Sequence, residues 1–529
     1  MNKRQHEEIE QRRLELQGAL DSAKSQAQRN KLGQFATPTA LATDILRAAK
    51  SFLPKTCPVR FLDPAFGTGA FYSALLRCFA ADRIEWAKGY EIDLHYGQPA
   101  RELWKGTPLA ITLSDFTTAV PPSDEKGKAT LIVCNPPYVR HHHIDAASKL
   151  RLRAASVRAS GVDLNGLTGL YCHFVTLSHA WMEKDAMAIW LIPSEFMDVN
   201  YGGPLKEYLL NRVTLMRIHR FDPDHVQFDD ALVSSAVVCF RNTEPFDGHL
   251  VEFTYGGTIV EPEQTRLVAR SELRPEAKWT RLAFAPKESM GEGEHAKLSD
   301  LFVIKRGIAT GANGFFVLPE AKAEELELPR RFLKPILPSP RFVQMDEIEA
   351  DDKGNPLIEP RMVLLDCRLP EDEIHQKYPR LWAYLQAGRA RGIHERYLCQ
   401  HRNPWYTQED RDPAPILCTY MGRTGEDKGA FRFILNHSRA ITANVYLLLY
   451  PKTILARMLR EKPELLRAMW TALNDIPWDA LLGIGRVYGG GLHKMEPKEL
   501  AAAPADTLMA LLPEEASCSS RQLTLTLTW

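Results

Sequence analysis

The chain has 529 residues, which is too long for one ordinary hydrophobic core and predicts two principal domains. Its hydrophobic share of 45% and charged share of 25% are typical of a globular protein. No stretch approaches the ~20 consecutive apolar residues that a membrane helix needs. Basic and acidic side chains number 66 each, so the net charge is zero and binding to nucleic acid would depend on local basic charge.

The pattern of cysteines and the composition of the N-terminal residues indicate the cell compartment in which the protein is expected. The nine cysteines are scattered, without a Cys-x-x-Cys pair or metal-ligand spacing, which indicates reduced thiols and no metal site. The charged N-terminal residues lack the apolar core of a signal peptide. We therefore expect a cytoplasmic protein.

In chain order, residues 1–30 are polar and predict an exposed helix without a chemical role. Residues 41–240 alternate short apolar runs with amphipathic stretches, a pattern typical of a sheet built from βα units. Because no helical crossover separates the last two predicted strands, we expect them to form an antiparallel hairpin. The predicted strands cover 59–65, 87–93, 109–115, 129–135, 186–193, 215–221 and 234–240.

The pattern changes beyond residue 240. Residues 241–295 contain prolines and turn signals, and we place the domain boundary between 245 and 295. Strand-like pieces follow at 301–307, 314–319 and 444–450. A helix is predicted over Thr453–Leu473, with an interruption at Pro463.

The first segment with chemical content is Phe61-Leu-Asp-Pro-Ala-Phe-Gly-Thr-Gly-Ala-Phe71. A strand enters a turn in which Gly67 and Gly69 let the backbone approach a ligand closely. Tyr72 occupies the position of the third glycine of a dinucleotide fingerprint, which weakens the dinucleotide interpretation. Taken alone, a plain strand-to-helix turn is an equally good interpretation.

Acidic residues end the next two predicted strands. Glu91 lies about 20 residues beyond the glycines, where a carboxylate can accept hydrogen bonds from ribose hydroxyls; Asp93 is the second choice. Asp115 can accept from the amino group of a bound adenine. A single acid at a strand end is more often a helix cap, but three at successive strand ends favour a cofactor site.

The most informative segment is Asn135-Pro-Pro-Tyr138, which follows the apolar strand 129–134. Two prolines stiffen the turn and remove backbone donors, so that the carbonyl groups stay free to accept. The Asn135 amide oxygen beside a free carbonyl makes a paired acceptor for an NH₂ group. The ring of Tyr138 offers a stacking face for the base that carries this group.

In this order, Gly33-Gln-Phe-Ala-Thr-Pro38, Asp63-Pro-Ala-Phe-Gly-Thr-Gly69 and Asn135-Pro-Pro-Tyr138 resemble the gamma-class N6-adenine DNA methyltransferases of type II restriction–modification systems. The resemblance covers about residues 30–240. Beyond them, residues 305–311 and 488–497 look like target-recognition segments.

This resemblance implies an α/β fold with a Rossmann-like, doubly wound sheet that ends in an antiparallel hairpin. It also implies a mixed α+β target-recognition domain at the C-terminal side. The corresponding division is an N-terminal helix (1–30), a catalytic domain (31–245), a connecting region (246–294) and a DNA target-recognition domain (295–529).

The resemblance further assigns a site for S-adenosyl-L-methionine. Thr37 lies near the methionine end, Glu91 holds the ribose, and Asp115 binds the adenine amino group. Pro137 packs beside the adenine. The residues that line the loop are Asp63, Pro64, Ala65, Phe66, Gly67 and Gly69.

The target base is assigned to four residues. The Asn135 side chain and the Pro136 carbonyl accept from the adenine amino group, while Tyr138 and Phe228 stack on the flipped base. Direct transfer to N6 needs positioning and electrostatics, with neither a metal nor a covalent intermediate. Unstacking the base costs a few kcal/mol.

Two other reactions use similar residues. Enzymes that methylate cytosine N4 usually have Ser in place of Asn135, and the glutamine N5-methyltransferases that share this tetrapeptide are much shorter. The expected partners are double-stranded DNA and a cognate endonuclease encoded separately, with the methyltransferase acting as a monomer.

Residues 139–158 contain one acid, Asp145, and either clamp the DNA backbone or form a solvated helix face. Their basic residues are Arg140, Lys149, Arg151, Arg153 and Arg158. Three adjacent histidines, His141–His143, cannot easily converge on one metal ion.

Overall fold

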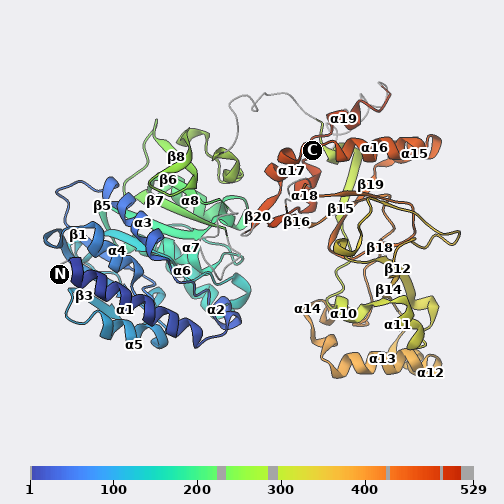
Figure 1. The fold of residues 1–529 in the computed structure, drawn as a ribbon, viewed down its shortest axis with the longest axis horizontal. Coiled ribbons are helices and arrows are strands. Elements are labelled where there is room, and N and C mark those ends of the chain that lie inside the picture. The colour runs from blue at the N-terminus through green and yellow to red at the C-terminus, as the bar shows by residue number, and fades with distance from the viewer. Residues whose placement is uncertain (1–2, 223–233, 284–295, 424–428, 489–491, 514–529) are drawn as a thin grey trace. The chain divides into compact units, whose positions relative to one another are not determined.

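The computed structural model describes residues 3–222, 234–283, 296–423, 429–488 and 492–513 (Figure 1). The chain divides into two compact units, Met1–Gly291 with Tyr488–Gly490, and Glu292–Val487 with Gly491–Trp529. The domain bounds given from the sequence stay predictions.

The first unit is built on a nine-stranded sheet in the order β3-β2-β1-β4-β5-β7-β6-β8-β9. Strands β3, β2, β1, β4 and β5 are parallel, and β7 is antiparallel to both β5 and β6. The strands are β1 (Val59–Asp63), β2 (Ile84–Tyr90), β3 (Leu109–Thr112), β4 (Ala129–Cys134), β5 (Met182–Pro193), β6 (Thr214–Arg220), β7 (Ser235–Arg241), β8 (Leu250–Gly257) and β9 (Pro262–Ala269).

Both faces of this sheet are covered, which explains why its central strands are almost continuously apolar. Every residue of β1 and of β4 is buried. Phe61, Leu131 and Val133 pack on one face with α3 (Thr39–Phe52) and α4 (Ala70–Cys78). Leu62 and Ile132 pack on the other face, with α6 (Ala146–Ser160), α7 (Leu170–Leu177) and α8 (Gly203–Asn211). The predicted Rossmann-like, doubly wound sheet is confirmed.

The antiparallel β6–β7 pair is present as predicted, but it does not end the sheet. β8 pairs with β6 in parallel, and β9 pairs with β8 in antiparallel fashion. Residues 246–294, described above as a connecting region, therefore supply two further strands. The expected alternation is obscured on β9, where two residues are charged and four of the eight are exposed.

The N-terminal residues form α1 (Lys3–Ser22) and α2 (Gln26–Leu32). The expectation of an exposed helix holds for most of α1, but it misses one side of the helix, where His6, Glu10 and Arg13 are buried. These three residues are polar, so a search for an apolar face does not detect their burial.

The second unit is mixed α+β, as predicted. A five-stranded sheet has the order β10-β19-β15-β17-β13 and a four-stranded sheet the order β11-β14-β12-β18. The strands are β10 (Phe302–Arg306), β11 (Val317–Pro319), β12 (Leu333–Leu337), β13 (Glu347–Ile348), β14 (Met362–Leu365), β15 (Ile416–Thr419), β17 (Phe433–Asn436), β18 (Ile441–Thr442) and β19 (Tyr446–Pro451). The predicted long helix is interrupted before Pro463, giving α15 (Thr453–Glu461) and α16 (Glu464–Asn474).

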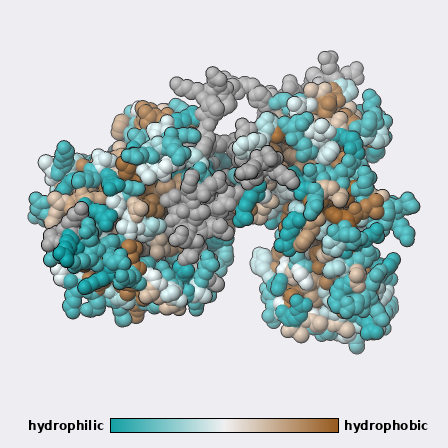
Figure 2. Space-filling model, in the orientation of Figure 1, coloured by the Kyte–Doolittle hydropathy of each residue, from teal (hydrophilic) through white to brown (hydrophobic). Residues whose placement is uncertain are grey.

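Hydrophilic residues cover most of the face drawn in Figure 2, and the hydrophobic residues on it are scattered. Within the described ranges, no helix combines the length and apolarity required to cross a bilayer.

Candidate active site at the carboxyl edge of the parallel strands

The sheet changes its direction of winding between β1 and β4, which are neighbours. The chain leaves β1 towards α4 on one face, and leaves β4 towards α6 and α7 on the other. Ligands of open α/β sheets bind in the crevice at such a switch point, beyond the carboxyl ends of the strands. The glycine loop after β1 and the segment Asn135-Pro-Pro-Tyr138 after β4 both lie at this edge.

The glycine loop is held by its neighbours along the sheet. Gly67 N donates to Glu91 Oε2 at 2.8 Å, and Phe66 N donates to Tyr90 O at 2.8 Å. Trp104 Nε1 donates to Thr68 O at 2.9 Å. Both Gly67 and Gly69 have positive φ, and a Cβ on Gly69 would lie 2.6 Å from the rings of Phe66 and Trp104. Gly69 is therefore required by conformation and by space.

Glu91 joins the two strand ends. Besides Gly67 N, its carboxylate accepts from Asp93 N at 2.8 Å. Burial raises the pKa of Glu91 above its ordinary value. Each oxygen receives one of these hydrogen bonds and retains a further lone pair for a ligand.

Asp93 and Asp115 act as helix caps within the protein. Asp93 accepts from His95 N at 3.0 Å and from Gln34 Nε2 at 2.8 Å, and it pairs with Lys24. Asp115 accepts from Thr117 N at 2.8 Å. Both residues therefore cap helices, as the alternative interpretation of the sequence predicts. Asp115 also lies just beyond the end of β3, the strand beside β2.

Asp63 is fully buried at the end of β1, where it accepts from Ala65 N at 3.2 Å. Burial raises its pKa from 3.8 to about 7. The folded protein therefore binds this proton more tightly than the unfolded chain does. The resulting stabilisation is complete below pH 3.8 and is lost as the pH rises through about 7.

We expect Asp63→Asn to be more stable than the parent protein, by a margin that grows from pH 5 to pH 8. The asparagine cannot ionise, so it avoids up to ~4 kcal/mol of cost at the upper end. Urea unfolding at both pH values measures the margin, with the exposed Asp124→Asn as a control. An equal margin at pH 5 and pH 8 would contradict the assignment.

The Asn135 side chain is fixed by its amide donors. Its Nδ2 donates to Phe35 O and to Thr37 Oγ1, both at 3.1 Å. Its Oδ1 is buried and has no hydrogen-bond partner among the residues that the structure describes. Burying a hydrogen-bond acceptor without a partner costs free energy. We therefore infer that this oxygen accepts from a donor that the described residues do not supply.

Tyr138 is connected to the segment 33–38. Its N donates to Gly33 O at 3.2 Å, and its ring lies 5.6 Å from that of Phe35. Its hydroxyl donates to Leu191 O at 3.1 Å. Only 9% of the residue is exposed, so the ring that the sequence assigns to base stacking offers a small free surface.

Of the other predicted site residues, Pro136 is buried and Pro137 half-buried beside Asn135. Cys134, to which no role is assigned, is buried. Phe228 lies outside the described residues.

Sequence reasoning passed over Ile92, which lies between Glu91 and Asp93 and is 67% exposed. Ile92 lies at the same edge of the sheet as the glycine loop. A large apolar side chain exposed there is suited to pack against the face of a planar ring. Its position between two predicted site acids is the signal that identifies it.

Among the basic residues of 139–158, two are already paired. Arg153 forms an ion pair with Asp163, and Arg151 donates to Thr117 O at 3.0 Å. Arg140 and Arg158 are exposed, as are His142 and His143.

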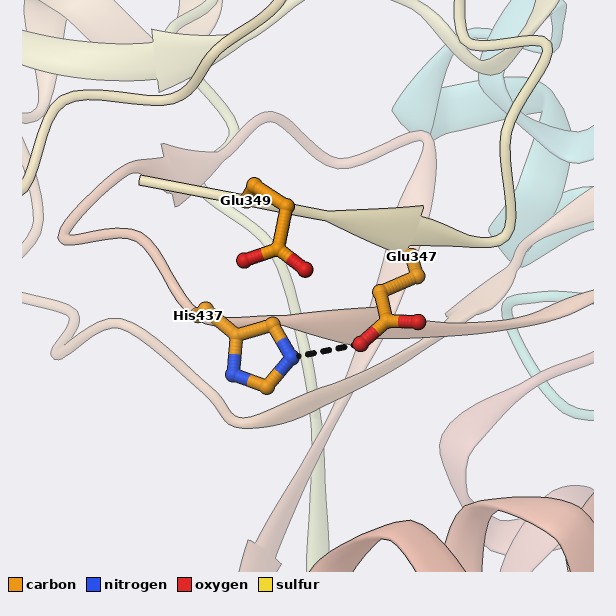
Figure 3. Close-up of side chains that lie close together, drawn as sticks. All are labelled: Glu347, Glu349 and His437. Carbon is orange, nitrogen blue, oxygen red and sulfur yellow. Dashed lines mark hydrogen bonds and ion pairs between the residues drawn. The ribbon is translucent and has the colours of Figure 1, made fainter. Parts of the chain in front are cut away.

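The described residues contain one group with the spacing of metal ligands, and it lies in the second unit. Ligand atoms of Glu347, Glu349 and His437 lie within 4.8 Å of one another (Figure 3). Glu347 accepts from His437 Nε2 and from Arg467 Nη1, both at 2.9 Å. The guanidinium already neutralises this carboxylate, so we interpret the group as a link between β13, the end of β17 and α16.

Comparison with known proteins identifies relatives for both units. The family model "Type II methyltransferase M.Eco57I, C-terminal domain" matches residues 276–522. The model "Eco57I restriction-modification methylase" matches residues 86–227.

Two relatives match most of the chain. Type II methyltransferase M.AccI of Acinetobacter calcoaceticus is 28% identical over 498 residues, which are 89% of this chain and 85% of the relative. Type II methyltransferase M.XamI of Xanthomonas campestris pv. amaranthicola is 28% identical over 455 residues, 84% of this chain and 80% of the relative.

A solved structure of the type IIL restriction–modification enzyme MmeI in complex with DNA has a similar fold. The TM-score is 0.55 with 12% identity, and the match covers 96% of this chain and 78% of that chain.

Proposed function

Because the chain carries Eco57I-type restriction–modification methylase domains, we propose that it transfers a methyl group from S-adenosyl-L-methionine to the N6 amino group of adenine in double-stranded DNA. The observation that carries the choice of an amino group as target is the unpartnered Oδ1 of Asn135. The amide cannot turn over without losing both hydrogen bonds of Nδ2, so its oxygen stays directed away from Phe35 and Thr37.

Adenine N6 is a weak nucleophile because its lone pair is delocalised into the ring. Asn135 Oδ1 and the Pro136 carbonyl accept its two hydrogens and favour a tetrahedral nitrogen, whose lone pair is then free to attack. S-adenosyl-L-methionine, when bound, supplies an electrophilic methyl group. The chain's contribution is positioning and fixed dipoles.

The edge beyond β1 and β2 fits this cofactor. The glycine loop lets the backbone approach it, Glu91 keeps lone pairs for the ribose hydroxyls, and Asp115 accepts from the adenine amino group. We add Ile92 as an apolar surface for the adenine ring, because it is exposed beside Glu91.

The base must leave the duplex to reach Asn135, at a cost of a few kcal/mol. We propose that Tyr138 contacts the flipped base along the exposed part of its ring. Phe228 stays a predicted stacking partner, which is able to return ~1–3 kcal/mol of this cost.

We propose that the second unit recognises the DNA target. Tyr420 brings together the two segments that resemble recognition segments: Arg306 lies 4.0 Å and Lys494 5.2 Å from the centre of its ring. Arg402 Nη2 donates to Ala309 O at 2.6 Å. These contacts hold together residues that are far apart in sequence. We further propose a separately encoded endonuclease and a monomeric methyltransferase.

Product analysis tests the function. Purified protein, S-adenosyl-L-methionine and duplex DNA should yield N6-methyladenine by nucleoside mass spectrometry. A cytosine amino group or a glutamine side chain presents the same two hydrogens to Asn135. N4-methylcytosine, 5-methylcytosine or label found only in protein would therefore overturn the adenine assignment.

We expect Glu91→Ala and Asp115→Ala to weaken cofactor binding while leaving DNA binding intact. Each carboxylate loses charge-assisted hydrogen bonds of ~1.5–3 kcal/mol, or roughly 10- to 150-fold in affinity. Titration calorimetry with S-adenosyl-L-methionine measures the loss.

Asp124 provides a matched control for Asp115, because it caps a similar short helix by accepting from Gly127 N at 2.7 Å. Asp124→Ala should bind the cofactor normally. Equal affinities for the Asp115 and Asp124 variants would show that Asp115 is only a cap.

A further inference from the structure

The helix α1, to which sequence reasoning gives no role, contains a buried ion pair. Arg13 is 1% exposed and Glu10 4% exposed. Arg13 Nη2 donates to Glu10 Oε1 at 2.7 Å, and Arg13 Nε to Glu10 Oε2 at 2.8 Å. Burial alone would raise the pKa of Glu10, but hydrogen bonds from Arg13, Ser73 and Thr39 and the charge of Arg13 outweigh it and lower the pKa to about 2. The Glu10 carboxyl group is therefore ionised at neutral pH.

This pair reaches the glycine loop. Arg13 Nη1 donates to Thr68 Oγ1 at 3.3 Å, and Thr68 Oγ1 donates to Gln17 Oε1 at 2.6 Å. Thr68 is the residue between Gly67 and Gly69. At Gly67, an added Cβ would meet nothing within 4 Å, so packing does not restrain that glycine.

The same pair also reaches the segment that holds Asn135. Arg13 Nη2 donates to Thr39 Oγ1 at 3.0 Å, and Thr39 Oγ1 donates to Glu10 Oε1. Thr39 lies two residues beyond Thr37, which accepts from Asn135 Nδ2.

The C-terminal end of α1 continues these contacts to the second strand end. Tyr96 Oη donates to Asp21 Oδ1 at 2.8 Å, and His95 Nε2 lies 2.9 Å from Leu20 O. Just beyond the helix, Lys24 pairs with Asp93. Residues 10–24 thus follow the cofactor edge from the glycine loop to the end of β2.

We propose that α1 positions the glycine loop for S-adenosyl-L-methionine through Gln17 and Arg13, which hold the Thr68 hydroxyl. The inference rests on the proposed function. A loop with two glycines loses much conformational freedom when it binds a ligand. Fixing Thr68 beforehand removes part of that cost, so the contribution of α1 appears in cofactor affinity.

A double-mutant cycle with Gln17→Met and Thr68→Val tests this role, since both changes leave the Glu10–Arg13 pair intact. We expect each variant to bind S-adenosyl-L-methionine about 5- to 10-fold more weakly, as for one lost hydrogen bond. The double variant should bind no more weakly than the weaker single variant. Gln17→Met should keep kcat at saturating cofactor while KM for the cofactor rises.

Hydrogen exchange of residues 65–72 in the ligand-free protein gives a readout independent of the cofactor. Exchange should be faster in Gln17→Met and in Thr68→Val, and unchanged in Thr68→Ser, which keeps the hydroxyl. Arg4→Met is the matched control on α1, because its pair with Glu8 is exposed. Melting temperatures establish that each variant is folded.

Additive losses of affinity, or unchanged exchange of residues 65–72, would overturn the role of α1 and indicate that Thr68 acts on the ligand directly. Failure of the parent protein to bind S-adenosyl-L-methionine would instead refute the proposed function. In that case, hydrogen exchange of residues 65–72 in the ligand-free protein still tests whether α1 holds the glycine loop.

Discussion

Asn135→Ala should reduce methyl transfer by at least ~10²–10³-fold, the usual cost of removing one group that stabilises charge in a transition state. The alanine cannot accept from the target amino group, so the nitrogen keeps its delocalised lone pair. Affinity for S-adenosyl-L-methionine should stay within a few fold, because Asn135 is assigned to the target. Tritium transfer and titration calorimetry, run side by side, separate the two effects.

Asn165→Ala is a matched control for this variant. Asn165 also fixes a turn, since its Oδ1 accepts from Leu167 N at 3.0 Å, but it lies in a different loop. It should lose some stability and retain turnover. Turnover like that of the parent protein in Asn135→Ala would refute the mechanism, whatever the behaviour of the control.

Gly33→Ala should have the second large effect, on both stability and activity. The added Cβ would lie 2.3 Å from Tyr138 N and 2.7 Å from Tyr138 C, and these backbone atoms cannot rotate away. Gly33 also has φ of +64°, which costs an alanine ~1 kcal/mol. We expect a loss of several kcal/mol in unfolding free energy, or a displaced Tyr138 with methyl transfer reduced at least ~10²-fold.

Gly67→Ala distinguishes the cost of a positive φ from the cost of steric overlap between an added Cβ and its neighbours. Gly67 has a similar φ of +57°, yet its Cβ would meet nothing within 4 Å. Thermal unfolding should place this variant ~1 kcal/mol below the parent protein. If Gly33→Ala were no less stable than Gly67→Ala, the close contact between Gly33 and the backbone of Tyr138 would be refuted.

Local sequence patterns predict the sheet well because strands that are buried on both faces are continuously apolar. β1 and β4 are continuously apolar and buried on both faces, so their sequences alone identify them. Two prolines, Pro136 and Pro137, follow one residue beyond the end of β4, where a strand cannot continue. The acids at the ends of β2 and β3 are likewise visible as interruptions of apolar runs.

Other features depend on partners that no local pattern reveals. The burial of α1 comes from paired polar groups, Glu10 with Arg13, rather than from an apolar stripe. β9 looks like a connection because it begins with a proline, carries two charged residues and has four exposed residues among its eight. The direction of the Asn135 amide depends on Phe35 and Thr37, about a hundred residues earlier.

That last separation has a kinetic consequence. The contacts of Asn135 with residues 35 and 37 span 100 and 98 positions, so the chain must close a long loop before the amide is oriented. High contact order delays such pairings relative to local helices. During refolding, helical circular dichroism should therefore recover before methyl transfer does. A nascent chain can thus be compact and helical while it is still unable to modify DNA.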